Sequence, residues 1–185
     1  MKKSFAIVVS ALALFCSCNN TETPSSSPDS ILPQEIRKQN IARIKNLEKE
    51  MHKSVVLDNV TATLAIKAYD DFAKLFPEDS LAPDFLFKAG EITTATKQYP
   101  QSLMYYKNIT TNYPKNKLVD VSLYLQGVLL DNYLNDDAKA KIIYEEVIAK
   151  YPTSQYANDA KAAINNLGKS DEELIKEFEK KNKKK

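Results

Sequence analysis

Apolar residues along most of the chain recur at the spacing of an α-helix. Tyr69, Phe72, Ala73 and Phe76 stand at positions i, i+3, i+4 and i+7, which places them on one helix face. Residues 144–151 repeat this spacing. A proline follows each run and ends the helix, because proline lacks a backbone donor and disfavours helical geometry in the residue before it. The pattern predicts an all-α fold with short turns between helices.

The chain repeats itself with a period near 37 residues. Aromatic-proline pairs end at Pro77, Pro114 and Pro152, which are 37 and 38 residues apart. A tyrosine stands eight residues before each proline, and a glycine stands thirteen residues after each of the first two. Self-similarity at such a period is typical of stacked helical hairpins, in which neighbouring units bury each other's apolar faces.

We expect eight helices in a repeat domain that spans residues 33–182. Ser170 with Glu173 forms a capping-box pattern at the start of the last helix, and Gly168 suits the end of the helix before it. The first helix is short enough, at three heptads or fewer, that packing on the repeats is favoured over a coiled coil with another chain. The expected helices lie at about 33–54, 58–76, 82–97, 101–113, 118–133, 137–150, 154–167 and 170–182.

Two segments share a motif of small and apolar positions. In the first segment the motif residues are Leu86, Ala89, Gly90, Thr93, Ser102, Tyr106 and Pro114. In the second they are Leu123, Gln126, Gly127, Leu130, Ala140, Tyr144 and Pro152. This order resembles the tetratricopeptide repeat, whose pattern is W-x2-L-G-x2-Y, then A-x3-F, then P. The motif tryptophan is missing, Thr93 replaces a tyrosine, and polar Gln126 occupies an apolar slot. The resemblance implies a right-handed α-solenoid with a concave surface.

The linker after each proline is longer than in the usual repeat of this class. Six residues separate the proline from the next hairpin, in the segments EDSLAP, KNKLVD and TSQYAN. Such linkers resemble those of BamD-like outer-membrane assembly lipoproteins and of the periplasmic coordinator associated with the Tol-Pal system. The resemblance covers roughly residues 41–168. It implies a scaffold that binds a protein partner, or an accessory component of β-barrel assembly.

The N-terminus has the pattern of an export signal. Lys2 and Lys3 precede an apolar run over residues 5–15, which is shorter than the roughly 20 residues of a membrane-spanning helix. The following residues resemble a bacterial lipobox, in which small Ser17 precedes Cys18, whereas bulky Phe15 does not suit Cys16. We therefore expect a lipoprotein signal peptide at residues 1–17 and lipid attachment at Cys18.

Two other readings of the cysteines are weaker. They are either small apolar residues of a cleaved signal, or a C-x-C metal half-site without a second ligand cluster. Residues 18–32 are mostly polar and predict a flexible tether. Asn19 after the expected lipidated cysteine favours the outer membrane, with either face of that membrane open.

Composition excludes several kinds of chemistry. Only 3 Gly and 1 His occur among 185 residues, so a glycine-rich phosphate loop, a histidine triad and a multi-histidine metal site lack their residues. Adjacent acids such as Asp70 and Asp71 diverge by about 100° around a helix and form no facing pair. We expect no enzyme activity, cofactor or metal. Five of the last six residues are lysines, including the basic tail 183–185, and these are expected to be solvated at a helix end rather than to bind nucleic acid.

The tetratricopeptide resemblance implies a partner-binding groove along the first helix of each hairpin. Phe87 and Tyr124 are the expected aromatic anchors, with packing against a neighbouring hairpin as the alternative. Acidic side chains in this groove favour a basic peptide segment of an envelope protein. A surface lipoprotein that binds glycans or peptides for uptake is the alternative from another functional class. The candidate groove residues are Asp84, Phe87, Glu91, Thr94, Tyr124, Val128, Asp131 and Asn132.

Overall fold

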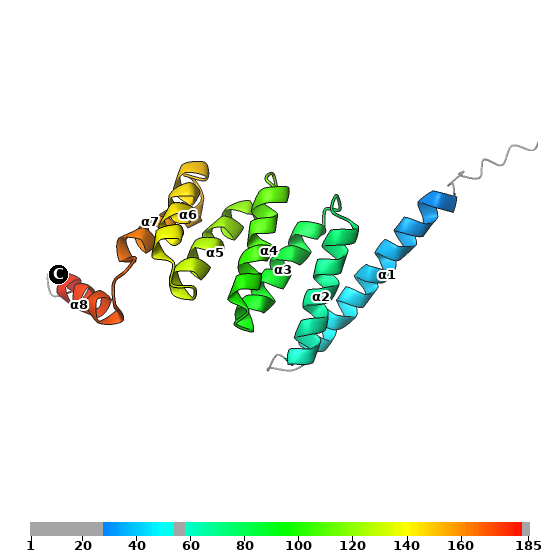
Figure 1. Ribbon diagram of the computed structural model, residues 1–185, viewed down its shortest axis with the longest axis horizontal. Helices are drawn as coiled ribbons and strands as arrows, with labels where there is room; N and C mark the ends of the chain where they lie inside the picture. The colour runs from blue at the N-terminus through cyan, green and yellow to red at the C-terminus, as the bar shows by residue number, and fades with distance from the viewer. Residues whose placement is uncertain (1–27, 54–57, 183–185) are drawn as a thin grey trace, which may run out of the picture.

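The chain folds into a row of eight helices in the computed structural model, which describes residues 28–53 and 58–182 (Figure 1). No strand occurs in these residues, so the predicted all-α fold of stacked hairpins is confirmed. The predicted signal peptide, Cys18 and the tail 183–185 lie outside the described residues. The helices are α1 (Pro28–Met51), α2 (Asn59–Leu75), α3 (Ala82–Ala95), α4 (Tyr99–Asn112), α5 (Val119–Asn132), α6 (Asp137–Lys150), α7 (Gln155–Asn166) and α8 (Asp171–Asn182).

Helix boundaries from α2 to α8 agree with the expected ones within two residues. The difference lies at α1, which begins at Pro28 and includes Pro33, so the last residues of the predicted tether are helical. The prediction began this helix at about residue 33 and assigned residues 18–32 to the tether. Proline near the start of a helix removes few hydrogen bonds, and α1 continues through it.

Successive helices pack as a linear array. Each helix from α1 to α6 packs on the next one, and α5 also contacts α7. The array therefore consists of antiparallel pairs, α1 with α2, α3 with α4 and α5 with α6, as Figure 1 shows. In the part of the chain that the structure describes, α8 lies at the end of the row without a comparable packing partner (Figure 1). An ion pair of 2.8 Å between Lys169 Nζ and Glu177 Oε1 joins α8 to the turn before it.

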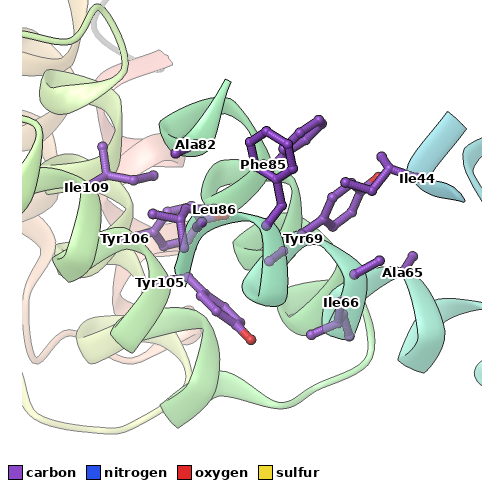
Figure 2. Packing of buried hydrophobic residues seen from close by; sticks show 14 of the residues in the cluster. Ile44, Ala65, Ile66, Tyr69, Ala82, Phe85, Leu86, Tyr105, Tyr106 and Ile109 are labelled. Atoms are coloured by element: carbon purple, nitrogen blue, oxygen red, sulfur yellow. The ribbon is translucent and has the colours of Figure 1, made fainter. Parts of the chain in front are cut away.

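Aromatic side chains fill the core between α1 and α5. Tyr69 stacks on Phe85 with ring centroids 5.4 Å apart, and Phe72 meets Phe85 edge-on at 4.8 Å. Figure 2 shows the run of side chains from Ile44 through Tyr69 to Ile109. A second cluster around Leu123, Tyr144 and Val147 continues the core through α5, α6 and α7. The regular aromatic positions of the sequence therefore supply the core, as expected from their spacing.

Each central hairpin is closed by a glycine under a tyrosine ring. A Cβ atom built on Gly90 would lie 2.7 Å from a ring carbon of Tyr106. The equivalent atom on Gly127 would lie 2.5 Å from the ring of Tyr144. The glycine and the tyrosine that recur in the sequence are therefore the two halves of one contact, which brings the two helices of a hairpin close together.

The long linkers share a side-chain turn that precedes the next helix. The side chains of Asp79, Asn116 and Ser154, each two residues after a proline, accept hydrogen bonds from backbone N–H groups two residues further on. The donors are Leu81, Leu118 and Tyr156, at 2.9, 2.9 and 3.3 Å. Because each linker holds the same turn, the longer period is part of the repeated structure.

Polar contacts fasten α1 to the array. The guanidinium of Arg37 donates to the carboxylate of Asp79 in the first linker. Glu48 accepts from Tyr69 Oη at 2.9 Å and from Lys88 Nζ at 2.6 Å. Glu48 therefore joins α1 to both α2 and α3.

We predict that Gly127→Ala lowers the free energy of unfolding by about 1–3 kcal/mol, because the new methyl group overlaps the ring of Tyr144. On a solvent-exposed helix face the same change would stabilise the protein by about 1 kcal/mol. The sign of the change in the free energy of unfolding therefore distinguishes the two cases. Urea denaturation of Gly127→Ala, Tyr144→Leu and the double variant measures the coupling. A stabilising Gly127→Ala, or costs that simply add in the double variant, would contradict the close contact.

We also predict that Asp79 makes the fold sensitive to acid. The hydrogen bond from Arg37, helped by the Leu81 N–H, lowers the pKa of Asp79 in the folded state. Its contribution is therefore complete above the unfolded pKa of about 3.9 and is lost as the pH falls through the lower folded value. Asp79→Asn keeps the side-chain turn, as Asn116 does naturally, and should flatten the dependence of stability on pH below about 4. The reverse change, Asn116→Asp, is the control, since it gives Arg37 no new partner. Equal acid denaturation profiles for Asp79→Asn and the native chain would exclude this role.

Candidate functional site

The eight predicted groove residues lie on α3 and α5, which are the first helices of successive hairpins. We call the surface formed by α1, α3, α5 and α7 the first-helix face. The four residues on α3 are three or four positions apart and share one stripe, and those on α5 form a second stripe. None of the eight is fully buried, and Glu91 and Asn132 are exposed.

The two expected aromatic anchors pack against the repeats. Phe87 lies 5.5 Å from the ring of Tyr106 in its own hairpin. Tyr124 lies 5.8 Å from Tyr144 and stacks on Tyr156 of α7 at 5.4 Å, with an interplanar angle of 26°. Both anchors are half-buried. The alternative of packing against a neighbouring hairpin therefore applies to Tyr124, and only part of each ring faces solvent.

Thr94 has its hydroxyl committed inside the hairpin. Its Oγ1 donates to the carbonyl oxygen of Gly90 at 2.8 Å and lies 2.6 Å from Ser102 Oγ. Ser102 Oγ also hydrogen-bonds the Gly90 carbonyl at 2.8 Å. Thr94 therefore helps to hold α3 and α4 together and presents no free hydroxyl to a partner. Val128, half-buried beside the second core cluster, likewise contributes packing.

The carboxylates of this face differ in their surroundings. Asp84 Oδ1 lies 4.0 Å from Lys117 Nζ. Desolvation raises the pKa of Glu91, although its side chain reaches solvent and nearby Lys88 opposes the shift. Desolvation also raises the pKa of Asp131, against a hydrogen bond of 3.3 Å from Tyr144 Oη. Holding these two acids at the face therefore carries an electrostatic cost to the fold.

The first-helix face extends beyond the predicted residues. Lys88 of α3 bridges to Glu48 of α1, and Tyr156 of α7 covers Tyr124. After burial, the charges of Asp159 and Asp131 raise the pKa of Tyr124 further. Asp159 stands two repeat periods after Asp84, so extending the period along the sequence would have identified it. The contact of Lys88 with Glu48 depends on how α1 packs, and the sequence carries no signal for it.

Three further features of the described residues concern other kinds of site. Within residues 28–53 and 58–182, no three His, Cys, Asp or Glu side chains form a group that could hold a metal ion. None of the described helices is long and apolar enough to cross a membrane. A cleft of about 690 Å³ lies between the ends of α2 and α4, and none of the predicted groove residues lines it. The first-helix face is thus an extended surface whose chemistry suits recognition of another molecule.

Comparison with known protein families identifies the repeat. Residues 121–154, which form α5, α6 and the linker to α7, match the tetratricopeptide repeat family. The chain carries a tetratricopeptide repeat. With the stacked hairpins around it, the fold is a tetratricopeptide-like α-solenoid. No curated protein matches the chain significantly.

Tetratricopeptide repeats generally mediate protein–protein interactions, and this helical array has the form of such a scaffold. The finer resemblance to BamD-like lipoproteins and to the Tol-Pal coordinator finds no support in these comparisons. The match covers the second central repeat, whereas the glycine and tyrosine of the preceding repeat, Gly90 and Tyr106, make the same close contact. The structure therefore extends the repeat beyond the matched residues.

We predict that Asp131→Asn makes the fold more stable at neutral pH. Since the folded pKa of Asp131 is raised, the native chain loses stability as the pH rises from about 4 through that raised value. The amide removes this loss while its oxygen still accepts from Tyr144. Thermal denaturation at pH 4 and pH 7 should show the gain at pH 7 only. Glu145→Gln, at an exposed site on α6, is the control. Equal gains at both pH values would argue against desolvation as the cause.

Proposed function

We propose that the protein is a lipid-anchored scaffold of the cell envelope, which binds a partner protein through the first-helix face. The tetratricopeptide repeat supports the scaffold role. The export pattern before residue 18, the lipobox-like residues and Asn19 support an anchor at Cys18 in the outer membrane. Residues 19–27 then form the spacer between the lipid and the start of α1 at Pro28.

The observation that carries this proposal is the combination of aromatic rings and desolvated acids on the first-helix face. Tyr124 and Tyr156 form a stacked pair with Asp131 and Asp159 close enough to affect the ionisation of Tyr124. Aromatic side chains concentrate binding energy at protein interfaces. Acids that lower the stability of a fold are commonly kept for a function.

The charge of this face selects the partner. Glu91 and Asp131 have raised pKa values because they are desolvated, and a cationic side chain placed beside them would favour their ionised forms. Lys88, the basic residue near Glu91, already pairs with Glu48 at 2.6 Å. The proposed ligand is therefore a basic, partly apolar segment of an envelope protein.

The direct test is crosslinking in cells with tagged full-length protein, purified from membranes and analysed by mass spectrometry. We expect the triple charge reversal Asp84→Lys, Glu91→Lys and Asp131→Lys to reduce recovery of the partner by about tenfold. The matched control reverses three exposed acids elsewhere, namely Glu145, Glu172 and Glu179. Cys18→Ala should release the protein from membranes and lower the recovery of membrane-bound partners.

The outcomes separate the competing functions. Equal recovery with both triple variants would remove the acidic face from the mechanism. A lipidated, membrane-bound protein that recovers no protein partner would contradict the scaffold function. Recovery of β-barrel assembly or Tol-Pal components, reduced in the triple variant and in Cys18→Ala, would assign the scaffold to one of those machines.

A further inference from the structure

A second candidate site lies on the opposite set of helices, between α4 and α6. Two adjoining lobes of about 280 and 290 Å³ open there, and both are lined by Lys107, Gln126 and Ile143. Lys107 comes from α4 and Ile143 from α6, while Gln126 of α5 lies between them. We call the two lobes together the α4–α6 cleft.

Gln126 presents an unused hydrogen-bond acceptor in this cleft. It is only 4% exposed, and its Nε2 donates to Thr110 Oγ1 at 3.2 Å and to the Ser122 carbonyl at 3.3 Å. The Thr110 hydroxyl donates its own proton to the Lys107 carbonyl at 3.0 Å, so it acts as an acceptor toward Gln126. These contacts fix the orientation of the amide. Within the described residues, no hydrogen bond reaches Gln126 Oε1, so this oxygen can accept from a donor in the cleft.

One lobe of the cleft is apolar. Ile142, Ile143, Leu103 and Leu130 line it, together with Lys107 and Lys139. Ile142 is 61% exposed at the edge of this lobe, so its side chain is accessible to a ligand. The volume of this lobe is sufficient for one large aliphatic side chain of a ligand.

The rim of the cleft carries positive charge. Lys107 is exposed and forms no ion pair among the residues described. Lys139 and Lys150 also line the cleft, but they pair with Asp136 and Glu146, each at 2.6 Å. Lys107 is therefore the available partner for an anion.

The repeat itself does not require these polar residues. One period earlier, the positions of Lys107, Thr110 and Gln126 are occupied by Asp70, Ala73 and Ala89. Ala89 is fully buried, and Asp70 and Ala73 line the equivalent cleft between α2 and α4. Three neighbouring positions have thus departed from the preceding repeat together, and all three contribute to one cleft.

We propose that the α4–α6 cleft binds a peptide segment in which a large aliphatic side chain is followed directly by a carboxylate. The aliphatic side chain enters the lobe lined by Ile142 and Leu130, and the carboxylate pairs with Lys107. A backbone N–H of the peptide donates to Gln126 Oε1. A fatty acid would offer the apolar chain and the carboxylate without this donor, so the unused acceptor favours a peptide.

The test is a titration followed by methyl NMR of the full-length chain in detergent micelles. The probe is the N-acetylated tetrapeptide amide glycine-leucine-aspartate-glycine, and the comparison peptide replaces aspartate with lysine. We expect the probe to shift the methyl signals of Ile142 and Ile143 saturably, while Ile92 of α3 is unaffected. The lysine peptide should bind about tenfold more weakly.

Variants of the cleft make the assignment specific. Gln126→Leu keeps the volume and removes the acceptor, and Lys107→Asp restores the charge of the preceding repeat; each should weaken binding by about tenfold. Ile142→Asp, at an exposed position, should abolish binding without unfolding the array. The triple charge reversal on the first-helix face should leave this titration unchanged. Failure of the peptide proposal can therefore be distinguished from failure of the proposed scaffold function.

Three results would overturn the proposal. The first is no shift at Ile142 and Ile143, and the second is equal binding of both peptides. The third is a shift that appears with rising protein concentration in the absence of peptide and disappears in Ile175→Asp. That result would assign the cleft to α8 of a second copy, whose exposed Ile175 lies between Glu173 and Glu177.

Discussion

The close approach of glycine and tyrosine within each central hairpin is the contact on which the array depends. At Gly90 and Gly127 a single added carbon would overlap the ring of a tyrosine on the second helix. The helices can therefore approach until Tyr106 and Tyr144 are buried, and those rings form the surface on which Phe87 and Tyr124 rest. Since a single hairpin cannot bury both of its apolar faces, this geometry is useful only when neighbours stack.

The parts of the fold that depend on residues close together in the sequence were predictable. The parts that depend on contacts between distant residues were not. Helical spacing and the terminating prolines are local, so they fixed α2 to α7 within two residues. The side-chain turns at Asp79, Asn116 and Ser154 are also local, and their common offset from each proline is visible in the sequence. The position of α8 depends on distant packing, and its capping box determined where it begins without determining what it contacts.

The candidate site was likewise predictable only in its local features. Its stripes on α3 and α5 follow from helix geometry, whereas the exposure of each side chain depends on the neighbouring repeat. Tyr124 is half-buried because Tyr156 stands on the adjacent helix, and Thr94 is committed because Ser102 lies opposite it. The charge pair of Lys88 with Glu48 requires α1 to lie across α3, which periodicity alone does not indicate.

Positions that carry the same residue in both central repeats are constrained by the fold. Positions that differ between the two repeats are free to take other roles. The glycines and tyrosines that set the hairpin distance recur in both central repeats, because each is limited by a contact of less than 3 Å to an added atom.

Gln126 replaces Ala89 at a buried position, and Ser122, which replaces Phe85, has a buried hydroxyl without a hydrogen bond in the described structure. Buried polar groups with unmet hydrogen bonds lower stability, and local rules are most often broken where a protein functions. The second central repeat carries such a cost at Ser122, and it holds a desolvated carboxylate at Asp131. Gln126 of the same repeat lines the open cleft. If both proposed sites are occupied, the array would hold two partners on opposite faces of one repeat.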